Sequence, residues 1–285
     1  MTAPTESKQY LDLCQQIAEA RSAFRIGHQD DIRISDEEIQ KRIDENKPLL
    51  NIQKLNMDGK LLDEFLRDFL PLLEKHEVFS REEIRNFLAN KEKINLSELV
   101  RSVLSKDLQS LKSLSSQYQI GIDSLLFVGL NLSQAVLELY ADKLKQKVDQ
   151  ENWLKGNCPV CGSYPAIEKL RRDDGKRILR CNFCGTEWHH KRIMCPFCGN
   201  EDHNSLRYFF IDEDSSTEKS AFRVDVCNKC KRYIKTLDER KLPESEKPDL
   251  YLENLNTIYL DVLAQKDGYK SPTYWMVALS EHIFV

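Results

Sequence analysis

Eight of the nine cysteines in this 285-residue chain lie between positions 158 and 230, as four pairs with two residues between the partners. The pairs are Cys158 with Cys161, Cys181 with Cys184, Cys195 with Cys198, and Cys227 with Cys230. Two cysteines at this spacing can point both sulfurs at one cation from a tight turn. A glycine follows three of the pairs and tolerates the positive φ that such a turn uses. Because two pairs supply the four thiolates of a tetrahedral site, the sequence predicts two metal sites.

The segments between the pairs indicate which pairs combine. Residues 166–170 and 176–180 are short strand-like runs on either side of Asp174-Gly175, which is a hairpin signal. A hairpin brings its two ends together, so the first site is predicted to be Cys158, Cys161, Cys181 and Cys184. Residues 206–211 and 221–226 flank a polar turn at 212–216 in the same way. The second site is therefore Cys195, Cys198, Cys227 and Cys230, and a crossed pairing, which would make the hairpins cross, is less favoured.

Three other uses of the cysteines compete with this interpretation. Disulfides are disfavoured in a reducing compartment. A thiol–disulfide enzyme uses one exposed CxxC at a helix N-terminus, whereas Cys195-Pro-Phe-Cys198 has a matching partner pair and precedes a predicted strand. Four thiolates can also hold an Fe–S cluster, so this use of the cysteines remains an alternative. We expect two mononuclear ions, iron or zinc, because soft sulfur ligands in tetrahedral geometry suit both metals.

The rest of the chain predicts an α+β protein: an N-terminal all-helical domain, two consecutive rubredoxin- or zinc-ribbon-like modules and a C-terminal helix. Residues 1–152 carry Leu-rich helical periodicity and few glycines, and predict five or six helices that serve packing. Ser80 begins a capping box, Pro71 predicts a kink or break, and residues 96–114 carry another apolar stripe. The first ribbon spans 153–190 and the second 191–242. In 243–285 an amphipathic helix over 252–263 ends near Gly268, and residues 272–285 receive no assignment.

Composition and charge limit the function classes. The chain has 42 basic and 46 acidic residues, a formal charge of −4, and its mean hydropathy is −0.54. No run approaches the roughly 20 apolar residues of a membrane span, and the N-terminus resembles no secretory signal, so we expect a cytoplasmic protein without membrane contact. Nucleic-acid binding is not favoured, because only the first ribbon is basic: residues 155–192 hold nine basic and four acidic side chains, against four and seven over 199–230.

The segment that joins the second and third cysteine pairs carries a more specific signal. Cys181-Asn-Phe-Cys184-Gly-Thr-Glu187-Trp188-His189 runs directly into Lys191-Arg-Ile-Met-Cys195. This segment resembles the family of the formate dehydrogenase accessory protein FdhE, whose members join these pairs by a similar Glu-Trp-His segment. The first pair, the last pair with its following Tyr233-Ile-Lys, and the helix closing in Asp267-Gly-Tyr also resemble that family. The resemblance is specific over about 155–270 and only general over 1–150.

The resemblance implies a cytoplasmic maturation factor that is not an enzyme and that binds the catalytic subunit of formate dehydrogenase. It also implies that the eight paired cysteines act as rubredoxin-like metal ligands. Glu187, Trp188 and His189 are candidates for partner contact, with burial of the Trp at the ribbon junction as the alternative. Cys14 is expected to be a buried apolar residue. An iron-based redox protein and a nucleic-acid-binding zinc ribbon remain alternative functions, and the oligomeric state stays open, a homodimer included.

Overall fold

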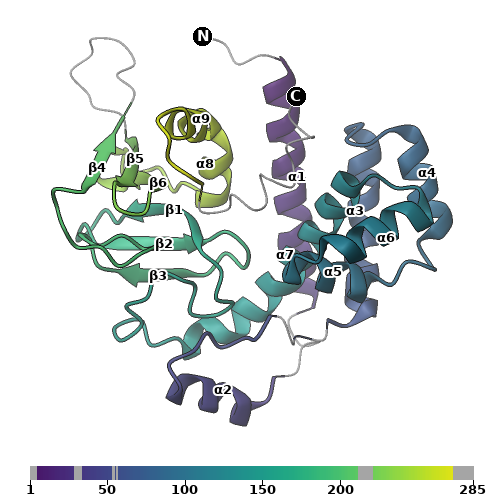
Figure 1. Ribbon diagram of the computed structural model, residues 1–285, viewed down its shortest axis with the longest axis horizontal. Helices are drawn as coiled ribbons and strands as arrows, with labels where there is room; N and C mark the ends of the chain where they lie inside the picture. Colours follow the sequence, from purple (N-terminus) through teal and green to yellow (C-terminus); the bar gives the residue numbers. More distant parts are fainter. Residues whose placement is uncertain (1–4, 29–33, 53–54, 56, 211–220, 272–285) are drawn as a thin grey trace. The chain divides into compact units, whose positions relative to one another are not determined.

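Helices make up the N-terminal half of the computed structural model, which describes residues 5–28, 34–52, 55, 57–210 and 221–271 (Figure 1). The helices are α1 (Thr5–Gly27), α2 (Asp36–Asp44), α3 (Gly59–Lys75), α4 (Arg81–Asn90), α5 (Leu96–Ser105), α6 (Leu108–Tyr118) and α7 (Ile122–Leu144), followed by the 3-10 turn η1 (Lys145–Lys147). The chain divides into two units. One holds α1 and α3–α7, and the other holds α2 together with the described residues that follow α7.

The helical unit buries the apolar stripes that the sequence displays. On α3, Leu62, Phe65, Phe69 and Leu73 recur at steps of three or four residues, and each is fully buried. Their aromatic rings stack, with 5.5 Å between the ring centroids of Phe65 and Phe69. The recurrence explains the helix, because only a period near 3.6 residues brings these positions to one face.

The structure adds detail to two local expectations in this unit. Pro71 does not break α3, which continues to Lys75, because the buried side chains on both sides of the proline hold the helix together. The stripe over 96–114 divides into α5 and α6. Lys106 takes a left-handed conformation with φ 61°, and the Asp107 side chain accepts hydrogen bonds from the backbone of Gln109 and Ser110 to begin α6.

Two other local predictions were right. Ser80 and Glu83 form the predicted capping box, with reciprocal side-chain and backbone bonds. Cys14 is buried, being 6% exposed. Both follow from local sequence signals rather than from long-range packing.

The second unit is built on a single six-stranded sheet. Its strands are β1 (Pro165–Leu170), β2 (Arg177–Cys181), β3 (Glu187–His190), β4 (Leu206–Phe209), β5 (Phe222–Cys227) and β6 (Arg232–Asp238), in the order β3-β2-β1-β6-β5-β4. Neighbours within each cysteine module are antiparallel. The modules join where β1 pairs in parallel with β6, from Ile167–Lys235 to Leu170–Asp238. The two predicted ribbons are thus halves of one sheet, while residue 211 and the turn at 212–216 lie outside the described residues.

Helices cover one face of this sheet. Leu260 and Ala264 of α9 (Ile258–Lys266) pack on Val224 and Tyr233, and Leu250 of α8 (Leu250–Asn256) packs near β1 and β6. The sequence predicted a single helix here. The structure breaks it at Thr257, whose hydroxyl donates to the Glu253 carbonyl at 2.7 Å while its backbone leaves helical geometry.

Charged side chains fill the opposite face of the sheet. Arg177 on β2 contacts Glu168 on β1 at 2.6 Å, and the side chains are 6% and 1% exposed. Thr236 on β6 lies 2.9 Å from the other Glu168 oxygen and 2.5 Å from Asp225 on β5, which pairs in turn with Arg223. Burial raises the pKa of Glu168 to about 7, against the opposing influence of Arg177. This polar network crosses four strands and therefore links the two modules.

Contrary to the expectation from the sequence, helix α7 has the length and apolar composition of a membrane span. With η1 it covers Ile122–Lys147, at a mean hydropathy of 1.4 over its most apolar window. Of that window, 72% is buried within the protein. Such burial is typical of the core helix of a helical domain.

We predict that Arg177→Met destabilises the protein by about 3–5 kcal/mol at pH 8, because the buried Glu168 carboxyl loses its partner and must either stay charged without it or take up a proton. Chemical denaturation of the metal-loaded protein measures this change. Arg171→Met is the matched control, since Arg171 pairs with Asp174 at the surface, where losing an ion pair changes stability little. Equal stability of the two variants would show that the network does not support the sheet.

Candidate metal centres

The first group of cysteines forms a closed cluster at one end of the first hairpin. Cys158 and Cys161 come from the loop before β1, and Cys181 and Cys184 come from the end of β2 and the turn after it. The Sγ atoms of Cys158 and Cys184 are 3.5 Å apart, and those of Cys161 and Cys181 are 3.4 Å apart. All four side chains are buried. We call this group site one.

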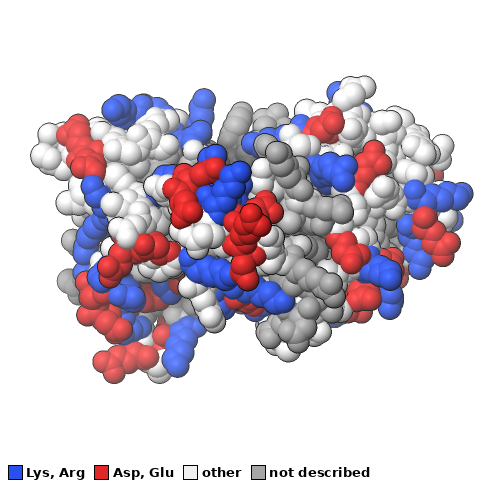
Figure 2. All heavy atoms as spheres, turned by 90° about the horizontal axis from the view of Figure 1, so that it is seen from below, with Lys and Arg blue, Asp and Glu red and all other residues white. Residues whose placement is uncertain are grey.

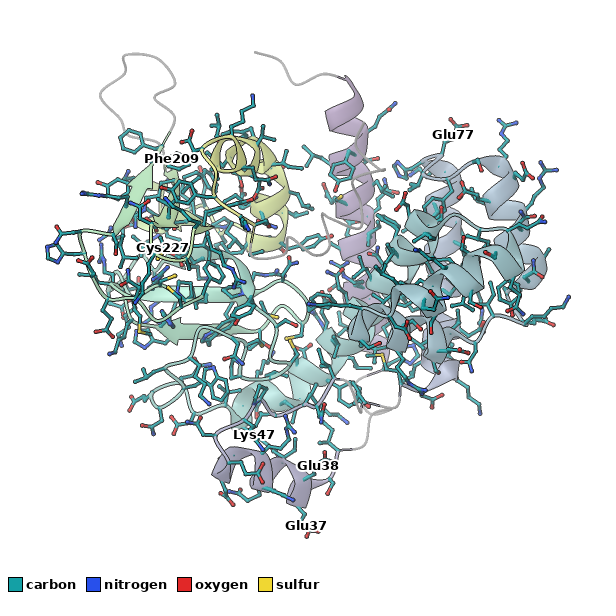
Figure 3. The ribbon with its side chains drawn as sticks, in the orientation of Figure 1. Glu37, Glu38, Lys47, Glu77, Phe209 and Cys227 are labelled. Carbon is teal, nitrogen blue, oxygen red and sulfur yellow. The ribbon has the colours of Figure 1, made fainter. Side chains whose placement is uncertain are left out.

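The second group repeats this arrangement with more exposure. Cys195 and Cys198 precede β4, and Cys230 lies in the turn before β6. Cys227, labelled in Figure 3, ends β5. The Sγ atoms of Cys195 and Cys230 are 3.7 Å apart, as are those of Cys198 and Cys227. Cys198 is exposed and Cys230 half-buried. We call this group site two, and the cysteines combine as the hairpin spacing indicated.

Both groups fit a tetrahedral metal ion. The four sulfurs of each lie within 4.8 Å of one another. A metal–sulfur bond of about 2.3 Å in tetrahedral geometry separates the sulfurs by about 3.8 Å, close to the distances in site two and a little longer than those in site one. Each group could therefore hold one ion. The four-sulfur set suits iron and zinc alike.

The backbone around the pairs follows one repeated pattern. In two pairs the glycine after the second cysteine donates to the carbonyl of the first, Gly162 to Cys158 and Gly199 to Cys195, both at 2.9 Å. These glycines have φ of 79° and 69°. The fourth pair lacks the glycine, yet Lys231 takes its place with φ 56° and donates to the Cys227 carbonyl at 2.8 Å. The turn geometry is thus kept where the sequence signal is missing.

The protonation of the sulfurs depends on burial and on hydrogen bonds. Burial raises the pKa of Cys158 and Cys181 well above the usual thiol value, and it raises the pKa of Cys230 to about 11. Hydrogen bonds from the three neighbouring thiols hold the pKa of Cys161 well below that value. Because a metal ion binds thiolates, its binding would displace the remaining protons, and metal affinity would fall as the pH falls.

The Glu-Trp-His segment forms β3. Trp188 is 1% exposed, and its indole nitrogen donates to the Lys155 carbonyl at 3.1 Å. Glu187 is exposed and pairs with Lys169 at 3.0 Å, and His189 is half-buried. The role of the three residues in partner contact stays a prediction, and Glu187 is the one that reaches the surface.

The basic hairpin of the first module is engaged within the protein. Arg171 forms an ion pair with Asp174, and Arg172 donates to the carbonyl oxygens of Leu242 and Pro243. On the face shown in Figure 2, Lys and Arg side chains are interspersed with Asp and Glu. The face therefore offers no continuous basic surface of the kind that binds a phosphate backbone.

Sequence reasoning missed two features of this unit. One is the buried polar network of Glu168, Arg177, Thr236 and Asp225, whose members are far apart in the sequence. The other is Gln150, whose side-chain amide donates to the Glu187 carbonyl at 3.3 Å and accepts from the His189 N–H at 3.1 Å. No local pattern marks either, because both depend on strand register.

Comparison with known proteins identifies the family. The family model described as FdhE, central domain, matches residues 157–192, and that described as FdhE, C-terminal domain, matches 193–276. The FdhE homolog of Aquifex aeolicus is 32% identical over 269 residues, which is 93% of this chain and 86% of that protein. FdhE of Escherichia coli O127:H6 is 32% identical over 114 residues, 39% of this chain and 34% of that protein. The chain therefore belongs to the FdhE family, as the cysteine-rich segment indicated.

A solved structure shows the same fold. The crystal structure of the FdhE protein from Pseudomonas aeruginosa matches with a TM-score of 0.60 at 20% identity, covering 92% of this chain and 90% of that one. The similarity thus extends into the helical half, where the sequence resemblance was only general. The predicted succession of a helical region, two tetracysteine modules and a helical C-terminal segment is confirmed.

We predict that Cys195→Ser or Cys227→Ser removes one metal equivalent per chain, since each deletes one of the four sulfurs of site two. Metal analysis of the anaerobically purified variants measures the loss. Cys14→Ser is the control, because Cys14 belongs to neither group and should leave the metal content intact. Unchanged stoichiometry in both site-two variants would contradict this assignment of ligands.

We predict that Lys231→Gly stabilises the metal-loaded protein by about 0.5–1 kcal/mol, because glycine adopts the left-handed conformation without the steric cost that a Cβ brings. Denaturant midpoints measure the change. Lys229→Gly provides the comparison, since Lys229 precedes Cys230 in the same turn and has no positive φ. A loss of stability in Lys231→Gly would show that the lysine side chain holds the turn.

Proposed function

We propose that this protein is a cytoplasmic accessory factor that binds the catalytic subunit of formate dehydrogenase and is needed for its activity. Membership of the FdhE family, with both tetracysteine groups present, is the observation that carries the proposal. In this account the protein is not an enzyme. It recognises its client and holds it during maturation, while the two sites serve structure.

The metal sites would act through folding. Each hairpin ends in four cysteines whose thiolates repel one another unless a cation lies between them. Metal binding to such a site contributes directly to folding free energy. The ions, iron or zinc, would therefore fix the ends of both hairpins and with them the sheet that presents the client-binding surface.

A second candidate function is electron transfer through an iron ion in site two. The exposure of Cys198 and the partial exposure of Cys230 favour it, because a redox partner could approach the sulfurs. An iron–thiolate site that cycled between the ferrous and ferric states would change its visible absorption. Site one, with four buried cysteines, is not suited to such contact.

We predict that anaerobic affinity capture from cells of the source organism recovers the formate dehydrogenase catalytic subunit, identified by mass spectrometry. The doubly substituted Cys195→Ser/Cys227→Ser protein should recover less, because site two no longer fixes its hairpin. A Cys14→Ser protein, expressed at the same level, is the matched control. Recovery of nucleic acid or of an unrelated redox protein, without the dehydrogenase, would contradict the proposed function. It would not affect the assignment of the cysteines to the two metal sites.

A further inference from the structure

Asn200 is a buried polar residue in direct contact with both cysteine pairs of site two. It follows the third cysteine pair and its glycine, and it is 8% exposed. Its backbone carbonyl accepts a hydrogen bond from the Cys195 N–H at 2.8 Å, which closes the turn of that pair. Its side-chain nitrogen Nδ2 lies 2.7 Å from Ser205 Oγ and 3.8 Å from the Sγ atom of Cys227. One side chain thus joins the first pair of site two to a sulfur of the second.

The surrounding hydrogen bonds fix the orientation of this side-chain amide. Its oxygen Oδ1 accepts from the Asp202 N–H at 3.4 Å. The single hydroxyl proton of Ser205 is donated to the Asp202 carbonyl at 3.0 Å, so the Ser205 oxygen is left to accept from Nδ2. A flipped amide would oppose the Asp202 N–H with a second donor and the Ser205 oxygen with a second acceptor. The nitrogen of Asn200 is therefore the atom that faces the sulfur.

The proton count leaves one N–H for Cys227. An amide nitrogen carries two protons, and Ser205 takes one of them. The other is available to the Cys227 sulfur, and hydrogen bonds to sulfur are longer than those to oxygen because the atom is larger. Such a bond is stronger to a thiolate than to a thiol, since a charged acceptor attracts the donor more. Cys227 itself is only 2% exposed, so the protein rather than bulk water has to supply this donor.

The first module has a different residue at the corresponding position. There the Cys158 N–H donates to the Ser163 carbonyl at 2.8 Å, which makes Ser163 the counterpart of Asn200. In site one a polar side chain contacts another cysteine, since Thr186 Oγ1 lies 3.1 Å from the Sγ atom of Cys184. The side-chain contact is thus on the second cysteine of the last pair in site one and on the first cysteine of the last pair in site two. Asn200 therefore distinguishes the two sites chemically.

From these contacts we infer that Asn200 is a positioning residue of site two, whose amide donates to the Cys227 thiolate and so strengthens metal binding there. Four thiolates and one divalent ion carry a net charge of −2, and an N–H aimed at a sulfur disperses part of it. Hydrogen bonds to the ligands of a metal orient them and tune the site. The inference concerns the chain's own residues around site two, and it holds whichever partner the protein binds.

The first test measures affinity for zinc in the full-length protein, by competition with a chromophoric chelator at pH 7.5. Asn200→Asp keeps the shape of the side chain but replaces the N–H with a carboxylate oxygen, which repels the thiolate. One of the two metal equivalents should bind about 10-fold more weakly, and the other should be unchanged. Asn204→Asp is the matched control, because it adds the same charge in the same loop at an exposed position. It should leave both equivalents as they are in the wild type.

The second test separates the hydrogen bond from a purely structural role. In the cobalt-loaded protein, the sulfur-to-cobalt charge-transfer absorption reports how strongly the sulfurs donate. Asn200→Ala should move this absorption to longer wavelength, because a thiolate without the N–H is a stronger donor. Ser205→Ala is the structural control: it loses a bond to Asn200 and keeps the amide beside Cys227. It should lower stability and leave the absorption in place.

Each outcome decides for or against the inference. Weaker zinc binding in Asn200→Asp together with the shifted absorption in Asn200→Ala supports it. Equal zinc affinities in Asn200→Asp and the wild type overturn it. An unshifted absorption in Asn200→Ala also overturns it, even if the protein is less stable, because the residue would then serve the loop alone. The same holds if Ser205→Ala shifts the absorption equally, or if the wild type binds no second metal equivalent.

Discussion

The parallel pairing of β1 with β6 is the interaction on which the cysteine-rich unit depends. Without it, the two antiparallel hairpins would be separate ribbons, each closed at one end by four sulfurs. With it, they become halves of one sheet with one helix-covered face and one polar face. The Glu168–Arg177 pair, extended through Thr236 to Asp225, reinforces this junction from within. The two sites therefore belong to one rigid sheet rather than to two flexibly linked modules.

The two sites lie at the same end of this sheet, because β1 and β6 run parallel, but they have different surroundings. Site one is sealed, and its sulfurs lie among buried side chains, so it is suited to a structural role. Site two is partly open, since Cys198 is exposed and Cys230 is half-buried. A single fold thus carries one sealed site and a second site whose sulfurs reach the surface. This asymmetry is not visible in the spacing within the cysteine pairs, which is the same in both modules.

The sequence predicts the parts of this fold that rest on local chemistry. Cysteine spacing, the glycines after the pairs, the capping box at Ser80 and the hairpin signal at Asp174-Gly175 all act within a few residues, so they can be recognised directly. Tertiary packing decides what these signals leave open: Pro71 is retained within a helix by buried neighbours, and the break at Thr257 has no strong local signal. The merged sheet, the Gln150 cap and the polar network depend on pairing between residues up to 70 positions apart, and no single segment encodes them.

We propose that active formate dehydrogenase requires this protein, and the enzyme's activity in cells of the source organism that lack this chain tests the requirement. We expect formate oxidation to fall close to background while the catalytic subunit polypeptide is still made. Expression of the wild-type chain should restore the activity, and expression of a chain without the site-two cysteines should not. Full formate dehydrogenase activity in the deletion strain would show that the enzyme does not require this protein.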